Sequence, residues 1–308
     1  MILWKLKRIQ NKLAIHHFIP KFILKGFSYN PNADKNQQSI TIYNKKTNKF
    51  SNELINFAFA EKDFNSDETE TILGEQYENI IARVFQRIQK RAYSNEKDVV
   101  LSNEEYRLLF RFFTIMWRRN NIQLEKINEM AMNINNEMKT LFGNNFKNML
   151  RPEYQDKNLT NLIKSNIENI KKPLYDKIIK DTTDEDETVQ KTILNYIPTI
   201  VYNKSNVHFL LHNTYGTLRY IKKANEEIQD SDFPQTFIEP ISKDLCFCLL
   251  LAQNQIDVKK DKFKIKIDVW ENDEDIIKFF IKDYLTETAT SYVVDETNYR
   301  YVTGDKNE

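Results

Sequence analysis

The chain has 308 residues, with 45 lysines and arginines against 44 aspartates and glutamates, so its net charge of +1 provides no global field for nucleic acid or anionic lipid. Hydrophobic residues make up 41% of the chain and charged residues 29%, which is typical of a folded globular protein and argues against extensive disorder. No apolar stretch reaches the ~18 to 20 residues of a membrane-spanning helix, and the charged N-terminus does not form a signal peptide. We therefore expect a soluble cytoplasmic protein without a membrane span.

In chain order, the first expected elements are short. Leucine and isoleucine at helical spacing predict an amphipathic helix over residues 2–13. Pro20 and Gly26 are placed to open and close a second short helix. An alternating pattern rich in β-branched residues predicts a strand over residues 39–46, followed by a turn and a second extended piece over residues 50–59.

The middle of the chain is predicted to be helical. Asp67 and Glu70 form a capping-box pattern, and hydrophobic residues at intervals of three and four continue this helix to about Ala92. A second capping box, at Ser102 and Glu105, precedes a hydrophobic stripe that continues through residue 142, long enough to act as a spine. Two or three more helices are expected over residues 158–202, ending near Pro198.

The last third of the chain is richer in apolar, β-branched runs. Four such runs predict strands of one sheet, at residues 207–211, 216–221, 244–251 and 263–270. A helix is expected to follow from Asp273 to about Tyr292.

These elements predict an α+β fold that is mainly helical. It has a long-helix middle region and a mixed or antiparallel sheet built from the N-terminal and C-terminal segments. With no long linker, residues 1–308 are predicted to form a single intertwined domain. Its expected sub-regions are 1–65, with the histidine pair and a strand, 66–205, which is helical, and 206–308, which is strand-rich and closed by a helix.

Several catalytic motifs are absent from the sequence. The five glycines stand apart, so neither a dinucleotide-binding GxGxxG turn nor a phosphate-binding GxxxxGK loop is present, and a GxSxG nucleophile turn is missing too. Cys246 and Cys248 lie two residues apart in an apolar run, which disfavours a disulfide and a zinc knuckle and indicates core packing. Nucleotide hydrolysis by a P-loop and dinucleotide redox chemistry are therefore disfavoured.

Two of the four histidines are adjacent, in the segment His16-His17-Phe-Ile-Pro20. This segment resembles the His-His-x-x-Pro of metal-dependent HNH nucleases, where one imidazole binds a divalent ion and its neighbour acts as a general base. By this reading His16 is the metal ligand and His17 the base. HNH nucleases add an asparagine and a further histidine some tens of residues later, whereas no histidine lies between His17 and His208. The alternative is a pair of structural imidazoles that are hydrogen-bonded within the fold.

A second candidate lies in the turn Asp230-Ser231-Asp232-Phe-Pro234, just before a run expected to enter the sheet. A carboxylate at a strand edge, here Asp232, can hold a metal or orient a histidine. The alternative for this segment is an ordinary Asx-turn.

Three charged residues on the two predicted long helices complete the candidates. Glu75 is expected on the inward side of the first helix, and Arg118 and Arg119 follow the aromatic stripe of the second. If buried, they could pair with each other or contact a phosphate, and if exposed they are ordinary helix-surface charges.

Together, these segments resemble a bacterial family, domain-of-unknown-function family 4238. Its motifs are a His-His-x-x-Pro-x-x-x-Leu-x-x-Phe-Ser start, an Ile-x-x-Tyr-x-Lys strand, a helix glutamate, an arginine after an aromatic position, a Ser-Asp-x-Pro turn and a Pro-Ile/Leu-Ser segment. The matching residues are His16, His17, Pro20, Leu24, Phe27, Ser28, Ile40 to Lys45, Glu75, Trp117 to Arg119, Ser231, Asp232, Pro234, Pro240, Ile241 and Ser242. The first dozen residues look like an extension, and the segment before Ser231 is polar where the family has an apolar strand.

The resemblance implies a shared fold and suggests that the histidine pair and Asp232 converge on one site. One hypothesis is a metal-dependent phosphodiesterase or nuclease. Its divalent metal would be held by His16 and Asp232, with His17 as the base and Arg118 or Arg119 near the scissile phosphate; its partner would be nucleic acid. The other hypothesis is a non-enzymatic protein-interaction subunit or effector of a bacterial defence or toxin system, with structural histidines.

Overall fold

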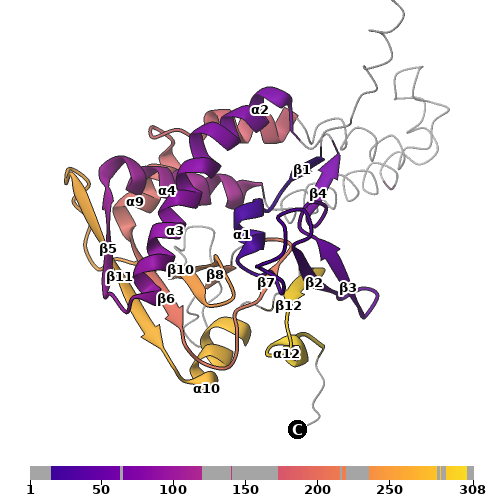
Figure 1. Ribbon diagram of the computed structural model, residues 1–308. Helices are drawn as coiled ribbons and strands as arrows, with labels where there is room; N and C mark the ends of the chain where they lie inside the picture. Colours follow the sequence, from indigo (N-terminus) through magenta and orange to yellow (C-terminus); the bar gives the residue numbers. More distant parts are fainter. Residues whose placement is uncertain are drawn as a thin grey trace, which may run out of the picture.

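The computed structural model describes residues 15–62, 65–119, 140, 173–215, 217–219, 236–282, 285 and 289–303, and these residues form helices packed on two larger sheets and one strand pair (Figure 1). No helix in these ranges is long and apolar enough to cross a membrane.

The larger sheet has six strands, and five of them come from the second half of the chain. All neighbours pair antiparallel except β11 and β6, which are parallel. The order across the sheet is β5 (Asp98–Ser102), β11 (Lys262–Trp270), β6 (Tyr196–Asn203), β10 (Leu245–Leu251), β9 (Thr236–Pro240) and β8 (Thr217–Arg219).

Alternate residues of this sheet enter two different hydrophobic cores, because successive side chains of a strand point to opposite faces. Phe247 of β10 faces the helices and stacks on Phe113, with ring centroids 4.4 Å apart. Cys246 and Cys248 face the other core, as reduced, buried thiols. The sequence prediction that the cysteines serve core packing agrees with this burial.

Helices cover both faces of the sheet. One continuous helical stretch and two further helices, α4 (Asn103–Arg118) and α9 (Glu187–Asn195), lie on the Phe247 side (Figure 1). The other face is covered by α10 (Asp273–Ile276) and a π-helical turn, η4 (Ile277–Ile281). The continuous stretch comprises α2 (Asp67–Ile72), the π-helical turn η2 (Leu73–Glu78) and α3 (Asn79–Tyr93).

A four-stranded antiparallel sheet joins segments from the two ends of the chain, as the sequence predicted. Its order is β3 (Lys49–Leu54), β2 (Ser39–Asn44), β12 (Ser291–Val294) and β7 (Leu211–His212). A short helix, α12 (Tyr299–Thr303), follows β12. The expectation that all C-terminal strands share one sheet is wrong, because β7 and β12 pair here and not in the six-stranded sheet.

The histidine segment forms a strand pair and a short helix. Here β1 (Ile15–His17) pairs with β4 (Ala60–Lys62), and α1 (Lys21–Lys25) runs from Pro20 to Gly26, which confirms the predicted short helix. A Cβ atom at Gly26 would lie 2.6 Å from the Ile241 carbonyl oxygen and 2.7 Å from Ser242 Cβ. The glycine is therefore required by close contact, which fixes α1 against the end of β9.

Three sequence expectations need correction. The fold is α+β, but it is not mainly helical, and no long-helix middle region is seen in the described ranges. The helices expected to end near Pro198 give way to β6 at Tyr196; Pro198 precedes Thr199, the first residue that pairs with β11, so its missing N–H is tolerated. The last predicted helix does not extend to Tyr292: it is helical through Lys282 in the described residues, and residues 291–294 form β12.

The helix starts are mostly as predicted. Ser102 and Glu105 form the expected capping box of α4. The first long helix is capped by Ser66, which accepts a hydrogen bond from Thr69 N–H, and not by Asp67. The continuation of α4 through residue 142 and the amphipathic helix over residues 2–13 lie outside the described residues, apart from Thr140.

Candidate functional site

The hydrogen bonds of the two adjacent histidines place the ring proton of each on Nε2. In His16 this follows from an acceptor role of Nδ1, and in His17 from a donor role of Nε2. His16 is buried, and its Nδ1 accepts a hydrogen bond of 3.0 Å from the backbone N–H of Asn65. His17 Nε2 lies 2.9 Å from the carbonyl oxygen of Ile55, which can only accept, so Nε2 donates. Neutral His16 therefore uses its lone pair inside the fold, whereas neutral His17 keeps its lone pair on Nδ1 for another group.

Burial keeps His17 neutral. Desolvation lowers its pKa from 6.5 to about 4, the charges of Lys21 and His16 act in the same direction, and the hydrogen bond to Ile55 opposes them. A fixed tautomer with one available lone pair suits either a proton acceptor or a metal ligand.

The π-helical turn η2 places two glutamates on the same side of the helix. Glu70 and Glu78 are eight residues apart, about one residue more than two α-helical turns of ~3.6 residues each. The wider π turn takes up that extra residue, so the two side chains point in nearly the same direction. The two carboxyls lie close enough to interact, since the charge of Glu70 raises the pKa of Glu78.

Arg119, at the C-terminal end of α4, lies beside both glutamates. Its side chain is only 2% exposed, and its guanidinium carbon is 5.9 Å from the centre of the Tyr175 ring. Burial lowers the pKa of Arg119, while the charges of Glu78 and Glu70 raise it. Burial also raises the pKa of Glu78 from 4.5 to about 7, and Arg119 and Lys21 only partly offset this. Glu78 therefore changes its protonation close to neutral pH.

Hydrogen bonds connect the histidine strand with these helices. The Asn65 side-chain amide donates to Glu70, while the Asn65 backbone binds His16. The next backbone N–H, of Ser66, donates to Asp176 Oδ1 at 3.0 Å. We call the connected set the polar cluster; its residues are His16, His17, Lys21, Asn65, Glu70, Glu78, Arg119, Tyr175 and Asp176.

The six residues predicted from the sequence are distributed unevenly around this cluster. His16, His17 and Arg119 belong to it. Glu75 is exposed, so its expected inward position is wrong; the π turn directs Glu78 inward instead. Asp232 lies outside the described residues. The catalytic and metal-binding roles of all six remain predictions.

Arg118 points away from the cluster and has different partners. Its guanidinium binds both carboxylate oxygens of Asp186, at 2.7 and 2.9 Å, and donates to the hydroxyls of Thr182 and Thr188. Asp186 is in turn the N-cap of α9. The expected pairing of Glu75 with an arginine is thus replaced by an Arg118–Asp186 ion pair and by the electrostatic interaction of Glu78 with Arg119.

Sequence reasoning missed Glu78, Glu70, Asn65 and Asp176. The available signal was the second glutamate eight residues after Glu70, on a helix that contains Gly74. A periodicity of three and four favours Glu75 only if the helix is regular, and nothing in the local sequence reveals the π turn. Asp176 is brought in from a distant helix at residues 173–181.

A metal ion has no complete set of ligands among the described residues, where no group of three or more histidine, cysteine, aspartate or glutamate side chains is arranged to hold one. His16 would also have to lose its bond to Asn65 before either ring nitrogen could offer a lone pair. His17 Nδ1 does not have this restriction.

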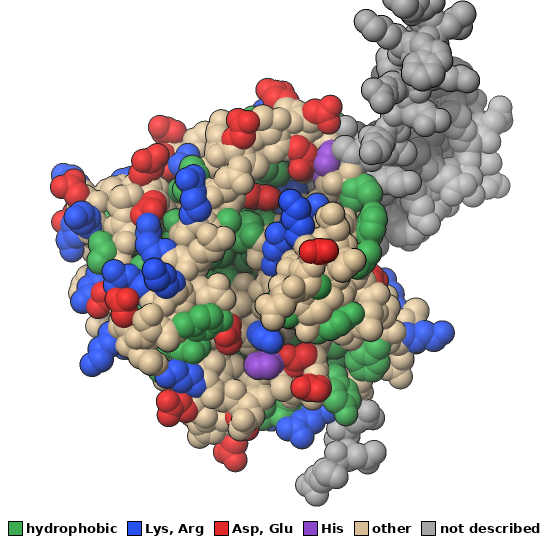
Figure 2. All heavy atoms as spheres, in the orientation of Figure 1, with side chains coloured by type: hydrophobic (Ala, Val, Ile, Leu, Met, Phe, Trp, Pro, Cys, Tyr) green, Lys and Arg blue, Asp and Glu red, His purple; other side chains and the backbone are tan. Residues whose placement is uncertain are grey.

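The exposed charges are mixed. Figure 2 shows acidic and basic side chains interspersed over the visible face, in agreement with the net charge of +1. Attraction of a charged partner to this face would therefore have to act locally.

Fold and cluster together define an α+β protein with a polar cluster that includes the adjacent pair His16 and His17. The chain belongs to the family described as protein of unknown function, DUF4238, whose model matches residues 15–304. The match begins after the first dozen residues, which the sequence had marked as an extension. No curated protein and no solved structure shows significant similarity to the chain.

Proposed function

We propose that the protein is a phosphodiesterase, most specifically a nuclease, that uses the polar cluster for general acid–base catalysis. The observation that carries this proposal is the pair of opposed pKa shifts in the cluster. His17 is neutral above a pKa of about 4, and Glu78 holds a proton up to a pKa of about 7. A base and an acid that are both in their active forms between these values are what hydrolysis requires.

In this mechanism, His17 Nδ1 accepts a proton from the water that attacks phosphorus. The bond from phosphorus to the leaving oxygen breaks, and that oxygen takes the proton of Glu78. The charge of Lys21 affects the pKa of both groups, which supports their closeness to one cation. Lys21 is exposed and is the residue we assign to the phosphate, while buried Arg119 acts as a positioning residue for Glu78.

A divalent ion held by His16 and Asp232 was expected from the sequence. The hydrogen bond between Asn65 N–H and His16 Nδ1 does not fit that role, so no catalytic step is assigned to a metal here. Metal dependence is decided by experiment, because His17 Nδ1 and Asp232 remain candidates for ligands.

The test measures cleavage of single-stranded DNA, double-stranded DNA and RNA by the full chain, with Mg²⁺, Mn²⁺ or Zn²⁺ and with a chelator. His17→Gln keeps an N–H donor for Ile55 but removes the base, and Glu78→Gln removes the acid. Each variant is expected to lose ~10²- to 10⁴-fold in kcat. For the wild type, kcat/KM should peak between pH 4 and pH 7, since both limbs follow the two pKa values.

Glu75→Gln is the matched control, because it makes the same chemical change on the same helical turn at an exposed position. We expect it to keep the activity of the wild type. Asp232→Ala tests the carboxylate predicted from the sequence. Absence of cleavage under every condition, or full activity of Glu78→Gln, would contradict the proposal.

A second candidate is supported by an exposed sheet edge. β3 is an outer strand of the four-stranded sheet, and apolar side chains on and beside it are exposed, among them Phe57 at 60% and Phe50 at 48%. Exposed apolar strand edges favour pairing with another strand. This supports a protein-interaction role, for which a subunit or effector of a bacterial defence or toxin system remains the prediction.

For this role we assign a second copy of the chain as the partner. Antiparallel pairing of β3 with itself about Ser51 would place Lys49 opposite Glu53 twice, and opposite charges stabilise such cross-strand pairs. Light scattering should then give a dimer that Glu53→Lys dissociates, while Lys49→Glu combined with Glu53→Lys restores it. A monomer at high concentration would exclude this pairing.

A further inference from the structure

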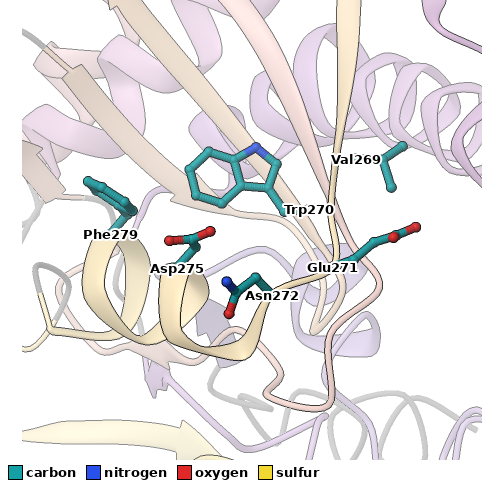
Figure 3. A pocket seen from close by; sticks show the side chains of 6 residues that line it. All are labelled: Val269, Trp270, Glu271, Asn272, Asp275 and Phe279. Atoms are coloured by element: carbon teal, nitrogen blue, oxygen red, sulfur yellow. The ribbon is translucent and has the colours of Figure 1, made fainter.

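A groove away from the polar cluster lies where β11 ends and α10 begins. It has a volume of about 640 Å³ and is lined by Val269, Trp270, Glu271, Asn272, Asp275 and Phe279 (Figure 3). This volume lies within the ~300 to 1,000 Å³ of small-molecule sites. None of the lining residues belongs to the polar cluster, so the groove is independent of the proposed catalytic function.

Two aromatic rings form a corner in the groove. The rings of Trp270 and Phe279 are 5.8 Å apart at an interplanar angle of 85°, and Trp270 also packs on Phe280 at 5.2 Å. The π-helical turn η4 contributes both phenylalanines. Contact with Phe280, which is buried, fixes the indole, so the corner is built before a ligand arrives.

The described residues that line the groove include two carboxylates, Asp275 and Glu271, and no lysine or arginine. Figure 3 shows the Asp275 carboxylate beside the Trp270 and Phe279 rings, and Glu271 lies at the rim on the other side of the strand. The neighbouring Asp273 accepts from Asn206 N–H, and the Asn272 side chain caps α10, so both are already in use. Of the two carboxylates that line the groove, Asp275 is the one that Figure 3 shows beside the rings.

A cation already contacts this corner. Lys278 Nζ is 5.1 Å from the centre of the Phe279 ring, at an exposed position of the same helical turn. Aromatic faces attract cations through the ring quadrupole, and indole does so most strongly. A perpendicular pair of rings with one carboxylate is therefore complementary to a positive charge with apolar substituents.

We propose that this groove binds a small quaternary ammonium compound of the choline type. The trimethylammonium group would contact the rings of Trp270 and Phe279, and Asp275 would balance its charge. The hydroxyl end of the ligand would point to the open side, towards Glu271.

The test compares choline with 3,3-dimethylbutan-1-ol, which has the same shape but no charge. Binding to the full chain is followed by tryptophan fluorescence, and Trp270→Phe identifies which of the three tryptophans reports it. We expect choline to bind at least ~5-fold more tightly than the neutral analogue, and Phe279→Leu to weaken choline binding by ~2- to 5-fold.

Asp275→Asn and Glu274→Gln form a matched pair on one helix, since each removes one charge but only Asp275 lines the groove. Choline binding should weaken in Asp275→Asn and persist in Glu274→Gln, with both variants retaining the circular dichroism of the wild type. Equal affinity for choline and the neutral analogue, or unchanged choline affinity in both Phe279→Leu and Asp275→Asn, would overturn the proposal.

Discussion

Two adjacent arginines at the end of α4 enter two regions with opposite properties. Arg118 makes four hydrogen bonds in the network of Asp186, Thr182 and Thr188, where one cation faces one carboxylate. Arg119 enters the polar cluster, where its charge is shared by Glu70 and Glu78.

The pKa values of the neighbouring carboxyl groups, Asp186 and Glu78, shift in opposite directions. Burial alone would raise the pKa of Asp186, but hydrogen bonds from Arg118 and from the first turn of α9 lower it below its ordinary value. Glu78 has no cation of its own, so burial prevails and its pKa rises to about 7. Proximity to an arginine therefore does not decide the charge of a buried acid; exclusive, well-aligned hydrogen bonds do.

The largest expected effect comes from Asp186→Ala. This change removes the N-cap of α9 and leaves the partly buried Arg118 guanidinium without its carboxylate, so the free energy of unfolding should fall by roughly 3 to 5 kcal/mol. Urea denaturation at pH 7 measures the loss.

Glu187→Ala is its control, since Glu187 is exposed and has only an i,i+4 ion pair with Lys191. Glu187→Ala should lower the free energy of unfolding by less than about 0.5 kcal/mol. A loss under 1 kcal/mol in Asp186→Ala would mean that the Arg118 network is not what holds α9 in place.

The next effect is a pH dependence of stability with opposite signs at His17 and Glu78. Between pH 6.5 and 4 the unfolded chain takes up a proton at His17 that the folded chain does not, so this contribution is lost as the pH falls. Between pH 4.5 and 7 the folded chain keeps a proton at Glu78 that the unfolded chain releases, so this contribution is lost as the pH rises. Each amounts to at most about 3.5 kcal/mol, at ~1.4 kcal/mol per pKa unit.

Urea denaturation of wild type, His17→Gln and Glu78→Gln from pH 4.5 to 7.5 separates the two. Relative to wild type, His17→Gln should gain stability at the acidic end, and Glu78→Gln should gain it at the neutral end. Buried His212, whose pKa is lowered to about 3 by burial, contributes equally to all three proteins and cancels in the differences. Parallel pH profiles for all three would show that the cluster does not shift these groups.

The smallest effect concerns the π turn that aligns Glu70 with Glu78. Deletion of Gly74 leaves the two glutamates seven positions apart, close to two α-helical turns, so the alignment should survive in a regular helix. Stability should stay constant or rise by up to about 1 kcal/mol, because glycine is a poor helix former. Calorimetry measures the stability, and the alkaline limb of the pH–activity profile, which follows Glu78, measures the alignment.

Insertion of one alanine after Gly74 is the opposite change. It rotates Glu70 away from Glu78 by a further residue, so the raised pKa of Glu78 should relax towards its ordinary value. If deletion destabilises the protein as much as insertion does, the π turn has a structural role of its own.

Elements with a strong local pattern were predictable. The capping box at Ser102, the short helix between Pro20 and Gly26, and the alternating strand at Ser39 all appear where the sequence placed them. The misassigned elements are short or lie in the second half, such as β6, whose apolar run fits a buried helix or a buried strand equally well.

The candidate site was likewise predictable only in part. The sequence by itself determined that His16 and His17 are adjacent, that Arg118 and Arg119 follow an aromatic stripe, and that no common nucleotide motif is present. Only the tertiary structure decided which arginine meets which acid, that Glu78 and not Glu75 faces inward, and which lone pair each imidazole keeps. The physical reason is that burial and hydrogen-bond partners set proton affinity, and these come from segments far apart in the chain.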